Sequence, residues 1–583
     1  MDMNEYKSLR EVDILGIYKK LSNIFSIKKV SDKNKEISEQ AWSVIVSYVA
    51  LRYKENESIE ATLEELNVEN IINEAFLKTM NETLKSIDIR HLIKQYSESE
   101  LKAFIMYPRT NLFTQRDTYT TPENISKLAL KLLDLKEQDL LLDMGSGLGS
   151  FLIEAKSLYE NIRSVGVDYD INNYIIARVK FKLLDFDIEM INDDIFKKEF
   201  LYSGTTTHAN KIFTNYPLGD KFQNLLLEPK IHKHMEMLFY EVNKNDFPYL
   251  AEWAYIFSAV NLIKNNSNGI AVILGSNGIA NNLSDSLVRK HLITEGFIEA
   301  VIALPGNLLS YSKAETTLMV LSEGNQSIRM VDATSLYTSG RRINELSDKN
   351  IEEIFNAYNN NSQVSISVDI DQIKKNDYNL HPKRYLSDTI IGDDFVTIAD
   401  IIEDIQRGAP IRARELADYT VDYKTDIRYL ELNNINDGLI DNELNCLDKV
   451  NQKLIENYSV KNRQVIISKS YPFKVAVVNK NKNEEIIAGG NLYCLDVNES
   501  KIDPYYLAAY LESENGRQEI EKYATGSVIK TLSIKGLKAI KIPRQNDALE
   551  KQIAKTYINI NQDISEARET LKQSKQEKNI LFK

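Results

Sequence analysis

The chain has 583 residues, of which 43% are hydrophobic and 27% charged, so we expect a globular protein too long for one core, with three or four domains. No apolar run reaches membrane-spanning length, the first residues do not resemble a signal peptide, and the two cysteines give neither a disulfide framework nor a zinc pattern; we therefore expect a cytoplasmic protein without a metal site. The net charge of −12 is unusual for a nucleic-acid binder, although residues 397–583 hold 28 Lys/Arg against 28 Asp/Glu and total charge does not exclude a local positive groove.

Residues 1–105 are predicted to form a helical N-terminal domain. Trp42, Ile45, Val46 and Val49 follow the i, i+3, i+4, i+7 spacing of one helix face. No residue here suggests chemistry, so we expect a packing role.

A turn, Tyr119-Thr120-Thr121-Pro122, precedes a helical stretch from Ile125 to Leu135. On its own the proline fits the first turn of an ordinary helix.

A glycine-rich turn follows a short apolar strand. Leu140 to Leu142 lead into Asp143, and Gly145, Gly147 and Gly149 come before a helix that starts near Phe151. Glycines at such a turn let the backbone pass close to a ligand, and the next helix offers unpaired N–H groups. The pattern fits a dinucleotide-type site, a phosphate loop or a plain structural turn. The lack of a Lys-Ser/Thr pair after the glycines disfavours the phosphate loop.

Two further strands end in polar side chains. Val165-Gly166-Val167 leads into Asp168, whose carboxylate suits a ribose diol. A third strand leads into Asp193 and Asp194, which fit either a ligand contact or an acidic turn. Another apolar strand, from Lys211, ends in Asn215-Tyr216-Pro217-Leu218.

Together these motifs resemble the gamma-ordered N6-adenine DNA methyltransferases, with the closest likeness to the modification subunit of type I restriction–modification systems. The resemblance continues through residues 251–254, 269–274 and 296–305, and covers roughly residues 106–325. It implies an α/β fold, with a Rossmann-like domain over residues 106–335 that uses S-adenosylmethionine (SAM).

The resemblance also implies a role for each motif. It implies cofactor binding by Tyr119, Thr120, Thr121, Pro122, Asp143, Gly145, Gly147, Gly149, Asp168 and Asp194, with Asp193 as the alternative to Asp194. It implies catalysis by Asn215, Tyr216, Pro217 and Leu218, where the Asn215 side-chain oxygen and the Tyr216 carbonyl accept the two N6–H bonds of a flipped adenine.

The catalytic motif departs from the family pattern, Asn/Asp-Pro-Pro-Tyr/Phe, in two places. Tyr216 replaces a proline, which matters less because its backbone carbonyl acts. Leu218 replaces the aromatic side chain that stacks on the flipped base, a contact worth about 1–3 kcal/mol. Tyr216 and Phe222 are candidates to replace that ring.

Residues 336–394 are predicted to be a connecting segment, in which residues 379–385 resemble the end of a modification subunit. Residues 395–545 resemble one α+β target-recognition domain of a type I specificity subunit. The likeness is carried by residues 396–408, 428–430, 465–469, 503–511 and 526–543. Two basic clusters there could face DNA or be plain solvated surface: Lys461, Arg463, Lys469 and Lys474, and Lys530, Lys535, Lys538 and Lys541.

Residues 546–583 are predicted to be a helical, coiled-coil-like tail. Ile553, Tyr557, Ile560, Ile564, Ala567 and Leu571 step alternately by four and three, as in a heptad seam. The seam is short, so we expect it to pack on another helix of this chain or of a second protomer.

We therefore predict that the chain is a site-specific DNA adenine-N6 methyltransferase of a restriction–modification or phage-defence system. Its expected partners are double-stranded DNA and either a second copy or separate specificity and restriction subunits, with no membrane. We see no nuclease or helicase motif, so cleavage would need another protein. The alternatives are a catalytically impaired DNA-binding component of a defence complex and an RNA or protein methyltransferase.

Overall fold

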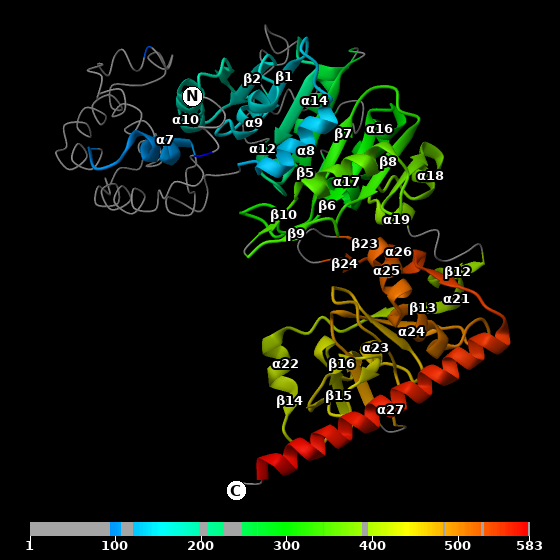
Figure 1. Ribbon diagram of the computed structural model, residues 1–583. Coiled ribbons are helices and arrows are strands. Elements are labelled where there is room, and N and C mark those ends of the chain that lie inside the picture. Colours follow the sequence, from blue (N-terminus) through cyan, green and yellow to red (C-terminus); the bar gives the residue numbers. More distant parts are fainter. Residues whose placement is uncertain are drawn as a thin grey trace. The chain divides into compact units, whose positions relative to one another are not determined.

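The chain forms two compact units, Met1–Pro382 and Lys383–Lys583, in a computed structural model (Figure 1). The structure describes residues 8, 64, 94–106, 120–196, 208–225, 239, 248–264, 266, 268–341, 343–386, 394–481, 484–525 and 530–580. Most of the predicted N-terminal helical domain, and Tyr119, lie outside these residues. The described part of that domain includes α7 (Glu98–Met106).

A nine-stranded mixed sheet forms the centre of the first unit, in the order β11-β8-β6-β7-β5-β4-β1-β2-β3 (Figure 1). This confirms the prediction of an α/β architecture. Its strands are β1 (Leu140–Met144), β2 (Arg163–Asp168), β3 (Glu189–Asn192), β4 (Lys211–Asn215), β5 (Ile270–Ser276), β6 (Ile298–Leu304), β7 (Thr316–Leu321), β8 (Ser327–Asp332) and β11 (Ser365–Asp369). A separate hairpin pairs β9 (Thr338–Ser339) with β10 (Asn344–Glu345).

Strands β3, β2, β1, β4 and β5 run parallel, and the order reverses between β1 and β4. Asp143 of β1 lies opposite Gly166 on one side and Phe213 on the other. The carboxyl ends of parallel strands at such a reversal form the usual ligand crevice of an open α/β sheet. The glycine turn, Asp168 and Asn215 all follow strands that end there.

Helices cover the sheet, and α8 packs between α9 and α17 (Figure 1). The described helices of this unit after α7 are α8 (Glu123–Leu133), α9 (Ser150–Leu158), α10 (Ile171–Leu184), α12 (Phe222–Leu225), α14 (Glu252–Ile263), α15 (Gly278–Asn281), η4 (Leu283–Asp285), α16 (Ser286–Thr294), α17 (Asp348–Asn359) and α18 (Ile370–Lys375). Buried apolar side chains of α8, α9 and α10 join those of the strands in one core.

The sheet continues past the predicted domain end at residue 335. Strand β11 pairs antiparallel with β8, and α17 packs on both β8 and α8. The predicted connecting segment, residues 336–394, thus contributes its first part, residues 336–382, to the edge of the first unit. Helix α19 (Lys383–Leu386) already belongs to the second unit, where it packs on α25 (Glu514–Tyr523).

Two four-stranded sheets and a small helical layer build the second unit. One sheet has the order β13-β22-β19-β20, with β13 (Ile402–Arg407), β22 (Leu492–Val497), β19 (Val465–Ser468) and β20 (Val475–Val477). The other has the order β14-β18-β15-β21, with β14 (Thr420–Val421), β18 (Asn445–Leu447), β15 (Ile427–Leu430) and β21 (Glu485–Ala488). Short strand pairs join β12 (Phe395–Thr397) to β25 (Lys541–Pro543), β16 (Ile435–Asn436) to β17 (Leu439–Ile440), and β23 (Ala524–Thr525) to β24 (Thr531–Leu532).

The long helix α27 (Asp547–Ile580) packs on α24 (Pro504–Glu512). Ala554 is buried, and Tyr557 donates a 2.5 Å hydrogen bond to Glu512, whereas Ile560 and Leu571 are 50% and 56% exposed. The predicted seam is therefore only partly covered by this chain. The other helices of this unit are α21 (Ile398–Ile401), α22 (Ala413–Tyr419), η5 (Leu432–Asn434), α23 (Gln452–Tyr458) and α26 (Ile534–Ala539). Within the described ranges, no helix is long and apolar enough to cross a membrane.

Candidate active site

The glycine turn after β1 is folded over the end of β2. The amides of Gly145 and Ser146 both donate to the Val167 carbonyl, at 2.9 and 2.8 Å, and Gly147 donates to Asp168 Oδ2 at 2.8 Å. A Cβ added at Gly145 or Gly147 would meet no described atom within 4 Å, whereas one at Gly149 would lie 2.5 Å from the Phe181 ring. Gly149 thus serves packing, while the backbone at Gly145 and Gly147 borders open space that suits a ligand.

Asp168 is the acid at the end of β2. Its carboxylate accepts hydrogen bonds from Gly147 N, Asp170 N at 2.9 Å and Asn173 Nδ2 at 3.3 Å. Burial raises the pKa of Asp168, and these donors oppose the rise. The pKa of Asp143 lies well above its usual range because of burial and, secondarily, the charge of Asp168. Next to Asp168, the ring of Tyr169 is 79% exposed, a feature that sequence reasoning missed.

The acidic turn after β3 is held by its own backbone. Asp193 Oδ1 accepts the Asp194 N–H at 2.8 Å, and Asp194 Oδ1 accepts the Phe196 N–H at 2.9 Å. The Asn192 side chain donates to the Asp168 carbonyl at 3.0 Å and so ties this turn to the end of β2. The turn that carries the two candidate carboxylates therefore lies beside the end of β2, next to Asp168.

Asn215 is the last residue of β4 and is 6% exposed. Its Nδ2 donates to Thr121 Oγ1 at 2.9 Å, which joins two predicted motifs 94 residues apart. Among the described residues, no donor reaches the buried Asn215 Oδ1. A buried acceptor without a donor costs free energy, so this oxygen is suited to receive an N–H from a bound molecule.

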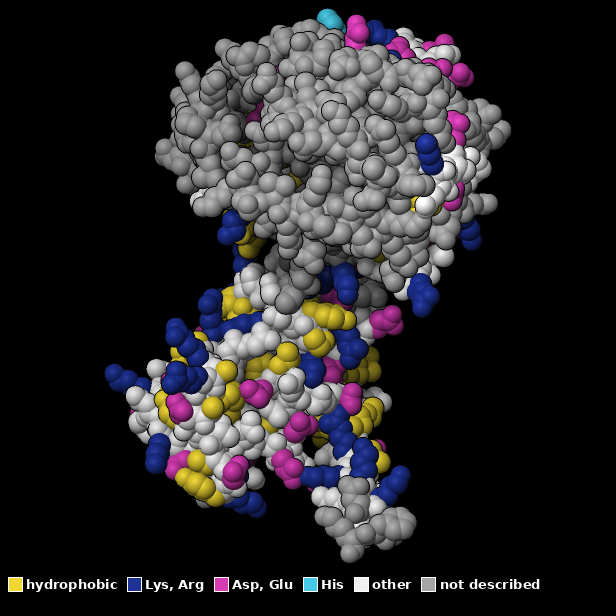
Figure 2. All heavy atoms as spheres, turned by 90° about the vertical axis from the view of Figure 1, so that its left-hand side faces the viewer, with side chains coloured by type: hydrophobic (Ala, Val, Ile, Leu, Met, Phe, Trp, Pro, Cys, Tyr) yellow, Lys and Arg dark blue, Asp and Glu magenta, His cyan; other side chains and the backbone are white. Residues whose placement is uncertain are grey.

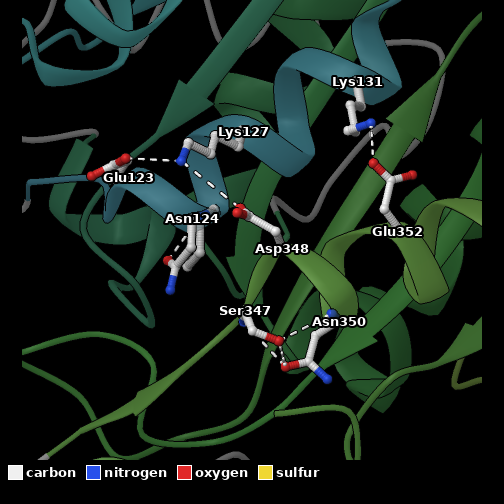
Figure 3. Close-up of polar contacts among 9 residues, drawn as sticks. Glu123, Asn124, Lys127, Lys131, Ser347, Asp348, Asn350 and Glu352 are labelled. Carbon is white, nitrogen blue, oxygen red and sulfur yellow. Dashed lines mark hydrogen bonds and ion pairs between the residues drawn. The ribbon is translucent and has the colours of Figure 1, made fainter. Parts of the chain in front are cut away.

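Helix α8 carries Thr121 and Pro122 at its start, and α17 braces it (Figure 3). Lys127 pairs with Glu123 at 2.9 Å and reaches Asp348 of α17 at 3.9 Å, and Lys131 pairs with Glu352 at 2.6 Å. Such exposed pairs are each worth about 0–1 kcal/mol, so they orient the helix more than they stabilise it. The late segment of the unit thereby helps to position Thr121.

The sequence offered Tyr216 and Phe222 as replacement base-stacking rings, and the structure places both inside the core. Tyr216 is 2% exposed and stacks on Tyr255, with ring centroids 4.4 Å apart. Phe222 is fully buried against Phe239. Neither side chain is free to stack on a base, because core packing already covers it. The other motif residues, Pro217 and Leu218, are half-buried, and Leu218 packs against the core.

One exposed ring does lie beside the catalytic motif. Tyr249 is 48% exposed, and its carbonyl accepts the Phe222 N–H at 2.9 Å. Lys221 Nζ lies 5.9 Å from the centre of its ring. The sequence signal was no more than a tyrosine in a loop, so the sequence alone could not have identified it.

The cofactor-side motifs and the catalytic motif converge around Tyr255. Burial is the main cause that raises the pKa of the Tyr255 hydroxyl. Tyr169, Asp194, Asp168 and Asp220 raise it further through their charges. Tyr255 also stacks on Tyr216, so three carboxylates act electrostatically on a ring that contacts the catalytic motif. A cluster of negative charge of this kind favours a cationic ligand.

The Glu252 carboxylate anchors the loop that follows Asn215 through hydrogen bonds. It is fully buried at the start of α14; Oε1 accepts the amides of Gly219 and Ser276, both at 3.1 Å, and Oε2 accepts Ser276 Oγ at 2.8 Å. The loop after Asn215 is thus fixed to the end of β5. Burial raises the pKa of Glu252 to about 7.

The raised pKa of Glu252 predicts a pH-dependent stability. Between pH 4.5 and about 7 the folded protein keeps this proton while the unfolded chain loses it, so the free energy of unfolding falls as pH rises. Glu252→Gln keeps an acceptor for both amides and cannot titrate. We expect the variant to gain stability relative to the wild type as pH rises through this window. Urea unfolding of both proteins at pH 5.0 and 7.5 gives the difference in free energy of unfolding between variant and wild type at each pH. The same difference at both pH values would contradict the prediction.

The cofactor-side motifs and the catalytic motif all lie within one stretch of the chain that matches a known protein family. Residues 109–394 match the family described as N-6 DNA Methylase. The chain is 26% identical over 389 residues to the type I restriction enzyme MjaVIII methylase subunit of Methanocaldococcus jannaschii, over 60% of this chain and 66% of the relative. It is 24% identical over 423 residues to the MpnII methylase subunit of Mycoplasma pneumoniae, over 65% of this chain and 76% of the relative. The chain thus spans just under two thirds of the first relative's own length.

Among solved structures, the type I restriction–modification methyltransferase subunit of Streptococcus thermophilus aligns with a TM-score of 0.45 and 18% identity. That alignment covers 63% of this chain and 98% of the other.

Proposed function

We propose, on the premise that residues 109–394 form an N-6 DNA methylase domain, that this chain is a SAM-dependent DNA adenine methyltransferase of a restriction–modification system. The observation that carries the assignment of the site is the buried Asn215 Oδ1, an acceptor without a donor at the end of β4. Its amide group is held by Thr121, so the oxygen is presented in one orientation.

The residues around the glycine turn fit SAM. The open space beside Gly145 and Gly147 leaves room for SAM to pass close to the backbone. The Asp168 carboxylate retains acceptor capacity for the ribose hydroxyls of SAM. Asp194, or Asp193 in its place, is assigned to the adenine amino group, and the exposed Tyr169 offers a ring to the adenine face. Asp143, Thr120, Thr121 and Pro122 complete the proposed site, Gly149 supports the turn by packing on Phe181, and Tyr119 remains a prediction from the sequence.

When bound, SAM supplies an electrophilic methyl group on a positively charged sulfur. The protein's part is to make the adenine N6 a better nucleophile. Asn215 Oδ1 and the Tyr216 carbonyl accept the two N6–H bonds, which draws the lone pair out of conjugation with the ring and stabilises the positive charge that develops on N6. Pro217 and the Glu252 contacts fix the loop so that this geometry is ready before the reaction. The extra proton leaves to water, because the motif offers no strong base.

Base stacking is the weakest part of this site. Leu218 offers only a half-buried aliphatic surface, so we assign part of the stacking to the exposed Tyr249. The same feature supports the second candidate function, a DNA-binding component with impaired catalysis. Leu218→Phe separates the two, because it should preserve or raise the rate of an active enzyme and leave an inactive protein inactive.

The second unit is proposed to be the target-recognition domain, within which the sequence motifs recur over residues 395–545. Its partner is duplex DNA, since a flipped adenine must come from a nucleic acid. One such domain reads one half-site, so a second copy or a separate specificity subunit would supply the other. The partly exposed seam at Ile560 and Leu571 of α27 is available for such pairing.

Methyl transfer to defined acceptors tests this function. Full-length protein is incubated with tritiated SAM and duplex DNA, single-stranded RNA or a protein lysate, and the DNA is then digested to nucleosides. We expect label in N6-methyldeoxyadenosine and competition by unlabelled duplex only. Label in RNA or protein would support the RNA or protein methyltransferase instead, and no transfer with intact SAM and DNA binding would support the impaired component.

A further inference from the structure

We propose that Arg407, Lys469 and Tyr471 form the part of the second unit that grips the DNA backbone. The inference rests on the proposed function, because it takes duplex DNA as the partner, and it names the surface that the sequence left open. Here the three residues are called the β13–β19 patch.

Arg407 and Lys469 lie next to the same aromatic ring. Arg407 ends β13, where it stands opposite Tyr493 of β22, and Lys469 directly follows β19. Lys469 Nζ lies 5.0 Å from the centre of the Tyr493 ring and donates to the Gly490 carbonyl at 2.5 Å. The strands of one sheet thus bring together two cations that are 62 positions apart in the chain.

The charge of Arg407 acts unfavourably on the charged form of Lys469. Burial lowers the pKa of Lys469 and Arg407 lowers it further, Cys494 opposes this change, and within the described residues no carboxylate contributes to it. Two like charges held in place raise the free energy of the free protein, and an anion between them lowers it. DNA phosphates are the anions that a nucleic-acid binder would place there.

Four of the other basic residues named from the sequence have different surroundings. Lys461 forms an ion pair with Asp496, and Arg463 pairs with Glu499 at 2.8 Å. Lys530 pairs with Glu521 at 3.3 Å, and Lys474 is held by the Leu432 carbonyl and Asn436. From the first predicted cluster we select Lys469, because its charged neighbour is the cation Arg407 and not a carboxylate. On the face of this unit that Figure 2 shows, acidic and basic side chains are interspersed, so the total charge did not indicate a basic patch.

Tyr471 extends the patch with an aromatic ring. It is 59% exposed, and its amide donates to the Lys530 carbonyl at 2.9 Å. Beside it, Ser470 Oγ donates to Asn491 Oδ1 at 3.1 Å, which ties the loop to the turn before β22. Tyrosine hydroxyls and cationic side chains are common donors to phosphate oxygens. The neighbouring backbone is also tightly packed, because a Cβ at Gly408 would lie 2.0 Å from the Gly489 carbonyl oxygen.

The test measures the salt dependence of DNA binding. Full-length wild type, Arg407→Ala, Lys469→Ala, the double variant and Tyr471→Ala are titrated against a fluorescein-labelled 40-base-pair duplex by anisotropy at 50–300 mM NaCl. Each lysine or arginine that leaves a phosphate should reduce the slope of log Kd against log salt by about one, and the double variant should bind about 10-fold or more weakly at low salt. Tyr471→Ala should weaken binding with little change in slope.

Lys461→Ala is the matched control, because its charge is already paired with Asp496; it should leave Kd and slope unchanged. The charge-keeping double variant, Arg407→Lys with Lys469→Arg, should restore the slope. If the wild type binds duplex and both alanine variants keep its slope, the patch is wrong and the proposed function still stands. The same holds if the charge-keeping variant fails to restore the wild-type slope. Wild type that binds no duplex would instead contradict the proposed function, and the patch with it.

Discussion

Replacing Asn215 by alanine is expected to lower the rate of methyl transfer to duplex DNA by at least about 100-fold, the loss seen when one preorganised hydrogen-bonding group that stabilises a transition state is removed. The side-chain oxygen has no donor among the described residues, so it is free to hold the adenine amino group as charge develops on N6. Because the interaction strengthens only in the transition state, the affinities for SAM and DNA should change little. Single-turnover transfer from tritiated SAM measures the rate, with calorimetry and anisotropy for the two affinities.

Asn215→Asp is the informative control, because aspartate keeps the acceptor and the Thr121 hydroxyl can turn to donate to it. We expect this variant to keep measurable transfer. Near-normal turnover of Asn215→Ala would show that the catalytic motif is misassigned. Equal inactivity of both variants, with intact folding and SAM binding, would argue that the amide matters through Thr121 and not through its oxygen.

Replacing Asp168 by alanine is expected to weaken SAM binding about 10- to 100-fold, because hydrogen bonds to a charged group are worth about 1.5–3 kcal/mol. The variant loses the acceptor for the ribose and also the anchor of Gly147 N, which shapes the turn. Calorimetric titration with SAM gives the affinity, and thermal unfolding without SAM shows whether the turn alone has been damaged. Gly147→Val is less clean, since its φ of 54° already strains any side chain there.

Glu160→Ala removes an exposed carboxylate just after the end of α9, outside the glycine turn, and should bind SAM as the wild type does. Asp193→Ala and Asp194→Ala form a second pair that resolves the adenine contact, since the larger loss of affinity identifies the carboxylate that holds the amino group. An Asp168→Ala protein that is stably folded and has unchanged SAM affinity would remove the cofactor assignment.

The sequence predicted the local elements of the first unit well, because each depends on residues close together in the chain. The apolar runs before Asp143, Asp168 and Asn215 are strands β1, β2 and β4, and the glycines after β1 do form the turn. Tyr216 lies in the loop after β4 and Phe222 begins the four-residue helix α12, so neither belongs to a periodic pattern long enough to show which side faces the core. Both are buried, and the stacking roles considered for them were wrong.

Contacts between distant segments could not be predicted from the sequence. The hydrogen bond from Asn215 to Thr121 spans 94 residues, and Glu252 reaches the catalytic loop only because α14 packs under β4 and β5. In the second unit, the partners of Lys461 and Arg463 come from segments about 35 residues further along the chain. No single-sequence pattern encodes these pairings, so the basic clusters looked alike until the structure separated them.

Long-read sequencing of genomic DNA tests the central claim most directly, because it reports activity, modified base and target sequence together. The full-length chain and its Asn215→Ala variant are each expressed in a methylation-deficient bacterium. We expect N6-methyladenine at one recurrent sequence motif with the wild type, and at none with the variant. A genome without modified adenine despite soluble, SAM-binding protein, or equal modification by Asn215→Ala, would contradict it.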